Sequence, residues 1–187
     1  IGIGNGMVEA VYNPLVASMY PDRKTKMLNR FHIWFPGGIV IGSIVGYLIM
    51  DVAGLGWQLL VATLFVPLLA YGVLFVGQSF PQTERVQMGV TAGESARSLV
   101  TPLYLFVGFC MLLSASTELG TTQRIESLLA ATGVNALLVL AFINGIMMVG
   151  RAMAGSIAKR ISTLGMLWFS AIFSFLGLQF LTLAAGD

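Results

Sequence analysis

The sequence predicts an all-α integral membrane protein, and the composition and the spacing of the charges are the observations behind this prediction. Hydrophobic residues make up 57% and charged residues 10% of the 187 positions, and the mean hydropathy is +0.87. A soluble domain of this length is much more polar. The charged residues leave five long uncharged stretches, at 31–50, 52–83, 98–117, 127–150 and 161–186. Each reaches the ~20 residues that an α-helix needs to cross ~30 Å of hydrocarbon.

The uncharged stretches favour helices over a membrane β-barrel. They lack the strict alternation of a barrel strand and far exceed its length of ~10 residues. Helices are the other structure that satisfies every backbone group in lipid. We expect six of them, at about 1–19, 28–50, 57–78, 101–122, 133–157 and 163–185. The chain begins in a helical pattern without an initiating Met and stops directly after an apolar stretch, so we expect a fragment whose first helix is cut short.

The basic residues predict the orientation of these helices. If the spans alternate, nine of the ten Lys and Arg residues lie on one side: Arg23, Lys24, Lys26, Arg30, Arg85, Arg97, Arg151, Lys159 and Arg160. Arg124 alone lies on the other side. The positive-inside rule assigns the first side to the cytoplasm, so we expect a multi-pass protein of the plasma membrane, in bacteria the inner membrane. The net charge of +2 reflects this bias and predicts no nucleic-acid partner.

The segment 79–100 differs from the other connections. It contains the polar run "PQTERVQMGVTAGESARS" with several Gly and Ser residues, whereas the connection "DVAGLG" is short. Such a composition is typical of a linker. We therefore expect a cytoplasmic linker at 79–100 that joins the end of one helical bundle, 1–78, to the start of another, 101–187.

Two further features are interpreted as packing. Gly38, Gly42 and Gly46 recur every four residues and form a face of small residues that allows close helix approach in lipid. Cys110 is the single cysteine, so the chain has no internal disulfide. Its apolar neighbours predict a core position for Cys110 rather than a metal site or a reactive thiol.

Polar residues in the first helix are the main functional candidates. Helical spacing puts Asn5, Glu9 and Asn13 on one face, and Pro14 loosens the backbone beside them. An ionisable group at membrane depth costs several kcal/mol, so it normally faces a bundle interior or a water-filled cavity on an ion or substrate path. Glu9 is therefore a candidate proton-coupling residue and Asn13 a candidate solute contact. The alternatives are a structural hydrogen bond to a neighbouring helix, or a Glu9 that lies nearer the interface.

A second polar face follows in the next helix. Asn29, His32 and Phe35 or Pro36 stack at steps of three and four residues, with Trp34 close by. Neutral imidazole both donates and accepts hydrogen bonds and titrates near working pH, so His32 is a candidate lining residue of a solute cavity. A packing role is the alternative for His32. Trp34 either stacks on a solute such as a sugar or anchors the helix in lipid.

The later helices add three candidates. The fourth predicted helix ends in a polar stretch with Glu118, which is either a second proton-coupling residue or the partner of Arg124 at the exterior interface. In the fifth predicted helix, Asn144 and Arg151 lie seven residues apart on one face. We take Asn144 as a candidate solute contact. Arg151, at the cytoplasmic helix end, is interpreted as a topology and gating residue.

Three motifs give the chain a resemblance to a known family. They are a Gly-rich helix with Glu four residues before Asn-Pro, a helix that begins with Leu-Asn, and a Gly-Arg loop signature: "GNGMVEAVYNPLVASMYPD", "KMLNRFHIWFPGGIVIG" and "GRAMAGSIAKR". These motifs resemble those of the major facilitator superfamily, and within it the fucose-permease-like sugar:proton symporters. The resemblance covers nearly the whole chain. It implies a fragment of a twelve-helix fold, about helices four to nine, with 79–100 between the two six-helix halves.

The resemblance also implies roles for individual residues. Glu9 matches the position that takes part in proton-coupled sugar transport in that group, and Asn13 matches the Asn of its Asn-Pro pair. Phe35 stands where that group has a substrate-contacting Asn, and His32 where it tends to have Gln, so the resemblance does not imply fucose as the solute. In this fold the first helix of each three-helix repeat lines the cavity, which implies that Glu9 and Glu118 both face it.

Together these features predict a secondary active transporter that moves a small polar solute, in first place a sugar, coupled to protons by alternating access. The partners expected are the solute, protons and the lipid bilayer, with no cofactor, and the complete protein is expected to be a monomer. A proton-coupled antiporter that exports a drug or metabolite is the second prediction. A passive channel or a structural membrane subunit is the alternative outside the transporters.

An enzyme is not expected from this sequence. It has no His/Asp/Glu cluster with metal-ligand spacing, no Ser-His pairing at membrane depth and no Gly-rich nucleotide loop after a strand. We therefore assign neither catalytic residues nor metal ligands.

Overall fold

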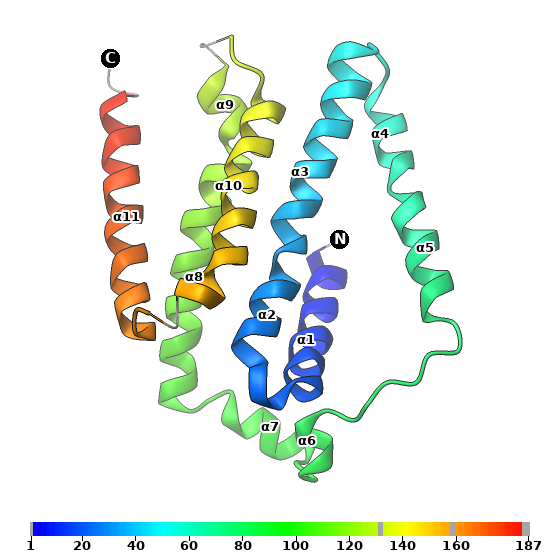
Figure 1. Ribbon diagram of the computed structural model, residues 1–187, viewed down its shortest axis with the longest axis vertical. Helices are drawn as coiled ribbons and strands as arrows, with labels where there is room; N and C mark the ends of the chain where they lie inside the picture. Colours follow the sequence, from blue (N-terminus) through cyan, green and yellow to red (C-terminus); the bar gives the residue numbers. More distant parts are fainter. Residues whose placement is uncertain (1, 131–132, 158–159, 185–187) are drawn as a thin grey trace.

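The computed structural model describes residues 2–130, 133–157 and 160–184, and the regular structure of this part of the chain is helical. Figure 1 shows the long helices side by side along the longest axis, with α6 and α7 at one end. Five stretches are long and apolar enough to cross a membrane: Pro21–Val52, Trp57–Phe75, Pro102–Gly120, Ala136–Ala154 and Leu164–Leu183. They lie where the sequence predicts helices. The first predicted helix is α1, Gly2–Met19.

The remaining elements follow α1 in chain order. They are η1 (Pro21–Arg23), α2 (Lys24–His32), α3 (Trp34–Gly46), η2 (Tyr47–Val52), α4 (Trp57–Thr63), α5 (Phe65–Phe75), α6 (Glu84–Gln87), α7 (Ala92–Ser98), α8 (Pro102–Gln123), α9 (Ile125–Leu129), α10 (Ala136–Ile157) and α11 (Thr163–Ala184). The element η1 is a 3₁₀ turn, and η2 is a π-helix that continues α3 directly. The rods α2–α3–η2 and α4–α5 are therefore each one membrane-crossing stretch made of shorter helices.

Proline explains why these rods are interrupted. Pro36 has no N–H group to donate to the carbonyl of His32, four residues earlier, so the regular pattern breaks at Ile33. It resumes with the hydrogen bond from Gly37 N–H to the Ile33 carbonyl, at 3.0 Å. Pro67 has the same effect between α4 and α5.

The most extensive helix packing joins α3 to α10. A Cβ atom placed on Gly37 would lie 3.5 Å from Met148 Sδ, and one placed on Gly46 would lie 3.5 Å from Leu137 Cδ1. Ser43, between these glycines, is buried as well. Small residues on α3 thus let two helices approach closely where lipid offers no hydrophobic drive for association.

The predicted packing stripe of Gly38, Gly42 and Gly46 is right for Gly46 and wrong for the other two. Gly38 and Gly42 are exposed, and a Cβ atom on either would meet nothing within 4 Å. The packed face instead follows steps of three residues along α3, whereas the prediction assumed the row of every fourth residue.

Large apolar side chains cover the surface of the molecule. Leu15 is the one buried large hydrophobic residue in the described part of the chain, whereas most others are exposed. An exposed apolar surface of this extent suits helices that face lipid or further helices. The core position predicted for Cys110 is wrong, because α8, which carries it, makes little contact with the other long helices and leaves the thiol exposed.

Basic residues gather at one end of the molecule. In Figure 1 the end of α1, the start of α2, α6, α7, the end of α10 and the start of α11 lie at the same end, and α9 lies at the opposite end. Arg124, just before α9, is thereby separated from the other described Lys and Arg residues. We call the Lys- and Arg-rich end the cytoplasmic end and the other the exterior end. Lys159, predicted at the cytoplasmic end, lies outside the described residues.

The segment 79–100 is tied to the first helices at this cytoplasmic end. Lys24 Nζ and Glu84 Oε1 form an ion pair at 2.5 Å. The Glu84 backbone N–H also donates a 3.0 Å hydrogen bond to Ser18 Oγ. The first part of the segment, including α6, is therefore held against the end of α1 and the start of α2.

Candidate functional site

The polar face of α1 carries Glu9 and Asn13 one helical turn apart. Glu9 is exposed, and about 15 Å of helix separates it from Met19, the last residue of α1 at the cytoplasmic end. Asn13 is half-buried, and its Oδ1 atom is buried without a hydrogen-bond partner among the described residues. Pro14 lies inside α1 and has no N–H group to donate to the carbonyl four residues earlier. The side chain of Asn5, predicted on the same face, lies outside the described part.

An aromatic cluster lies beside this face. The hydroxyl groups of Tyr12 on α1 and Tyr71 on α5 are 2.9 Å apart and share a hydrogen bond. The Tyr12 ring lies 6.1 Å, between centroids, from each of Phe31 and Phe75. Tyr12, Tyr71 and Phe75 also line a mainly apolar cavity of about 430 Å³. The cluster gives α1 an aromatic surface directly next to its Asn-Pro pair.

The break between α2 and α3 separates His32 from Trp34. His32 ends α2, is half-buried, and packs edge-on against Phe31 with ring centroids 5.4 Å apart. Because α2 packs against both α1 and α10, the helix that carries His32 adjoins the helix that carries Glu9. Trp34 begins α3 and is 73% exposed, and Phe35 is exposed too. Trp34 thus offers much of its ring to lipid or to a further helix. It stands at the start of the row of every third residue along which α3 packs, with its Cε3 atom 4.0 Å from a Cβ atom placed on Gly37.

Asn144 lies on the face of α10 that meets α3. It follows Leu137 by two turns and precedes Met148 by one, and both of those side chains would meet a Cβ atom placed on an α3 glycine. Asn144 is 1% exposed, and its Nδ2 atom donates a 2.9 Å hydrogen bond to the Leu140 carbonyl of its own helix. Its amide donor is therefore satisfied inside the helix packing.

Glu118 stands apart from the other candidates. It is half-buried near the exterior end of α8, a helix with little contact to the rest of the bundle and no extensive contact with α1. The Thr122 hydroxyl donates a 3.0 Å hydrogen bond to the Glu118 backbone carbonyl. The described residues show no ion pair between Glu118 and Arg124. The structure therefore does not bring Glu118 and Glu9 together.

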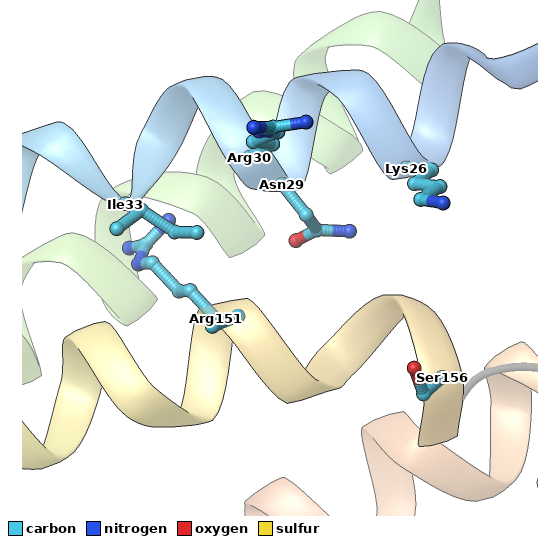
Figure 2. A pocket seen from close by; sticks show the side chains of 7 residues that line it. Lys26, Asn29, Arg30, Ile33, Arg151 and Ser156 are labelled. Carbon is cyan, nitrogen blue, oxygen red and sulfur yellow. The ribbon is translucent and has the colours of Figure 1, made fainter.

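Arg151 borders a cavity of about 270 Å³ at the cytoplasmic ends of α2 and α10. Figure 2 shows Asn29 and Lys26 reaching from α2 toward α10, and Arg151 reaching from α10 toward Ile33. Arg30 also lines the cavity. The Nε atom of Arg151 is buried without a hydrogen-bond partner in the described part of the chain.

At the exterior end, α10 and the η2 π-helix meet through polar side chains. Asn135 Nδ2 donates a 2.8 Å hydrogen bond to Asp51 Oδ1. The wide turn of η2 and the left-handed Gly54 (φ 65°) that follows end this rod next to the start of α10. Asp51 and Asn135 both line an open cavity of about 710 Å³. The structure therefore joins α10 to the α2–α3–η2 rod at both of its ends.

The sequence analysis missed three of these features: the Tyr12–Tyr71 pair, the Asp51–Asn135 pair, and the cavity that combines Arg151 with residues of α2. Each joins residues that lie far apart in the sequence, and no motif spans such separations. A weak local signal existed for the cavity, because Lys26 and Arg30 lie one turn apart and share a face of their helix. Nothing in the sequence indicated which residues of α10 this face would meet.

Comparison with known proteins identifies the family. Residues 1–187 match the family described as the Major Facilitator Superfamily. No curated protein and no solved structure matched the chain. Members of this superfamily are secondary transporters that move small solutes across a lipid bilayer. The family match over the whole chain, the all-helical fold and the five apolar helices together show that the chain belongs to the Major Facilitator Superfamily and is part of an integral membrane protein.

Proposed function

We propose that this member of the superfamily couples the movement of a small polar solute, a sugar in the first place, to protons by alternating access. Glu9 carries the proton, and Asn13 contacts the solute. The observation that carries the proposal is the α1 face, on which the Glu9 carboxylate lies one turn from the buried, unpartnered Oδ1 atom of Asn13.

The depth of this face supports a central binding site. Glu9 lies about 15 Å from the cytoplasmic end of α1, which is half of the ~30 Å thickness of the hydrocarbon core. His32 lies about 12 Å along α2 from Lys24, also at the cytoplasmic end, and so has a similar depth. Transporters bind substrates and coupling ions near this midplane, at helices whose regular pattern is interrupted. The break after His32 is such an interruption, and Pro14 removes one backbone donor from the otherwise continuous helix α1.

The chemistry of the face fits a solute with hydroxyl groups. The Asn13 amide oxygen accepts a hydrogen bond from a hydroxyl group, and the neutral imidazole of His32 can both accept and donate one. A buried acceptor without a hydrogen-bond partner is energetically unfavourable. A solute that donates a hydrogen bond to it removes this penalty, and the affinity increases accordingly. Trp34 offers a ring for stacking on a solute only if the exposed start of α3 faces a cavity in the complete bundle.

The proton step follows from the charge of Glu9. A carboxylate held at mid-depth resists passage through a closed, dry intermediate, whereas the protonated acid is neutral and can donate a hydrogen bond. Proton uptake and solute binding on one side therefore favour closure, and exposure to the other compartment releases both. Glu118 near the exterior end of α8 is the second proposed proton site, and Arg151 at the cytoplasmic end the proposed gating residue. Asn144 is the proposed solute contact on α10, reached only when the α3–α10 packing loosens.

The sign of solute-induced proton movement tests this proposal. The complete protein is reconstituted into weakly buffered proteoliposomes, and neutral monosaccharides are added outside while the external pH is recorded. Proton symport predicts transient alkalinisation of the medium that requires the transported sugar and disappears with a protonophore. Acidification would support the antiport alternative, and sugar entry without proton movement would support a passive channel; either result rejects symport.

A further inference from the structure

We propose that the cavity between the cytoplasmic ends of α2 and α10 binds the phosphate group of an anionic phospholipid from the cytoplasmic leaflet. The cavity is distinct from the α1 face of the proposed transport site. Its volume of about 270 Å³ is several times the ~30 Å³ that one water molecule takes up in the liquid, so a phosphate group fits together with bound water.

The charge of the lining favours an anion. Lys26, Arg30 and Arg151 bring three positive charges to the cavity, and none of the described residues that line it is Asp or Glu. The described residues contain no ion pair that engages any of these three side chains. Arg151 Nε is buried without an acceptor, which is a costly state for a guanidinium donor. A phosphate oxygen between α2 and α10 would supply the missing acceptor.

Uncharged donors complete the lining. Asn29 reaches into the gap from α2, and Ser156 faces it from α10 (Figure 2). The Asn29 amide already donates a 3.0 Å hydrogen bond to the Thr25 carbonyl, which fixes its position. Phosphate is recognised by such combinations of guanidinium, ammonium and neutral donors.

The cavity lies toward the cytoplasmic ends of the two helices. Arg30 lies six residues after the start of α2 at Lys24, and Arg151 six residues before the end of α10 at Ile157, which is about 9 Å of helix in each case. The polar head-group region extends several ångströms beyond each face of the hydrocarbon core. The cations therefore lie closer to the cytoplasmic surface than Glu9 and His32, and long Lys and Arg side chains can reach from there to the head groups on the side that the positive-inside rule assigns to the cytoplasm. Basic pockets between membrane helices at this level are a known form of head-group site.

The surroundings favour a lipid over a free phosphate. Ile33 and Ala152 add apolar surface to the lining. Toward the membrane centre, the neighbouring Trp34, which is the first residue of α3, is an exposed apolar side chain. Acyl chains attached to the phosphate can cover these side chains, whereas an inorganic ion cannot. The same molecule would thus use both the charged and the apolar part of the surface.

Lipid titration by native mass spectrometry tests the proposal on the complete, delipidated protein. Phosphatidylglycerol and phosphatidylcholine with identical dioleoyl chains are added separately, and the dissociation constant of the first bound lipid is determined. We expect phosphatidylglycerol to bind at least tenfold more tightly. The pair of substitutions Lys26→Gln and Arg30→Gln should weaken phosphatidylglycerol binding about 30-fold, because two cations near an anionic group are removed. Phosphatidylcholine binding should change little.

A matched control separates the cavity from general attraction. Substituting Arg85→Gln and Arg97→Gln removes the same charge from the 79–100 segment, outside the cavity. This control should bind phosphatidylglycerol like the unaltered protein. Equal weakening by both pairs of substitutions, or no preference for phosphatidylglycerol at the outset, overturns the proposal. The single substitutions, Lys26→Gln and Arg30→Gln, repeat the test if the double variant does not fold.

Competition distinguishes the two sources of a phosphate group. Millimolar inorganic phosphate or glycerol 3-phosphate should leave the first bound phosphatidylglycerol in place, because neither carries acyl chains. Displacement at these concentrations assigns the cavity to a free anion and overturns the lipid assignment. Retention of the lipid, combined with its loss in the Lys26→Gln and Arg30→Gln variant, supports it.

Discussion

The side-chain amide of Asn135 donates a 2.8 Å hydrogen bond to the carboxylate of Asp51, 84 positions earlier in the sequence. The same residue caps α10, because Asn135 Oδ1 accepts hydrogen bonds from the backbone N–H groups of Leu137 and Leu138, at 3.0 and 3.3 Å. One side chain thus starts a helix with its oxygen and ties that helix to the π-helix η2 with its nitrogen. This pair adds a polar contact to the packing between the two rods at the exterior end.

Separating the two roles of Asn135 gives the first prediction. Asn135→Ser keeps a helix-capping hydroxyl but cannot reach Asp51, whereas Asn135→Ala loses both the cap and the bond. We expect Asn135→Ser to lower the free energy of unfolding by about 1 kcal/mol, since one hydrogen bond to a charged group on an exposed surface is lost. Asn135→Ala should lower it by about 1 kcal/mol more. Denaturation of the detergent-solubilised protein measures both.

A double-mutant cycle checks that Asp51 is the partner. Once Asn135→Ser is present, Asp51→Ala should have almost no further effect, because the hydrogen bond is already absent. Strictly additive effects of the two substitutions would mean that these side chains do not interact in the membrane-embedded protein.

The packing of α3 on α10 gives the second prediction. Leucine at Gly46 would force its side chain into Leu60 and Leu137, which lie 3.4 and 3.5 Å from the position of a Cβ atom. We expect Gly46→Leu to destabilise the protein by about 1–3 kcal/mol, as overpacking generally does. Thermal unfolding followed by loss of monodispersity provides the measurement.

Gly42→Leu is the matched control for that prediction. It adds the same side chain to the same helix, but a Cβ atom at Gly42 would meet nothing within 4 Å. Its effect should stay within about 0.5 kcal/mol. If Gly42→Leu were the more damaging of the two, the packed face of α3 would be the one predicted from the sequence and not the one in the structure.

The third prediction concerns acid and the helix α7. Glu94 Oε2 accepts hydrogen bonds from the Thr91 backbone N–H and hydroxyl group, both at 2.8 Å, and the Glu94 N–H donates to Thr91 Oγ1. The bond from the Thr91 backbone, followed by that from its side chain, lowers the pKa of Glu94 below its ordinary value of 4.5. The folded pKa is the lower one, so this capping box contributes its stability above pH 4.5 and loses it as the pH falls through the folded value.

Hydrogen exchange of the α7 amides measures this effect. Protection factors, corrected for the intrinsic exchange rate, should be constant above about pH 5 and fall at lower pH. Glu94→Gln should keep the capping box and abolish the pH dependence, because Gln accepts the same bonds without titrating. A pH-dependent loss that persists in Glu94→Gln would assign the effect to another group.

The fold could be predicted from the sequence because its main determinant, hydropathy, is a simple sum over neighbouring residues. Whether a stretch crosses the membrane depends on the summed hydropathy of about 20 residues, so composition and charge spacing place every long helix. The breaks at Ile33 and Leu64 also have a local cause in Pro36 and Pro67. For the π-helix η2, we identify no local cause in the sequence.

The site was only partly predictable, for a physical reason. The face with Glu9 and Asn13 lies within one helix, and helical periodicity alone brings these residues together. Which face of α3 packs on α10 depends on the partner surface, so Gly38 and Gly42 were placed wrongly. The position of Cys110 failed in the same way, since apolar neighbours do not distinguish a buried helix from one that faces lipid.

The central claim is that Glu9 carries the coupled proton. Glu9→Gln removes the titrating group and keeps the size and hydrogen-bonding ability of the side chain. Solute bound to this variant can still exchange across the membrane, but no proton accompanies it. Glu94→Gln makes the same chemical change outside the membrane-crossing helices and serves as the control.

The most direct measurement compares pH-driven accumulation with counterflow in proteoliposomes of the complete protein, using a sugar that the unaltered protein transports. We predict that Glu9→Gln abolishes accumulation against a gradient and retains counterflow exchange, whereas Glu94→Gln retains both. Accumulation at the level of the unaltered protein in Glu9→Gln would contradict the account and remove Glu9 from the coupling mechanism.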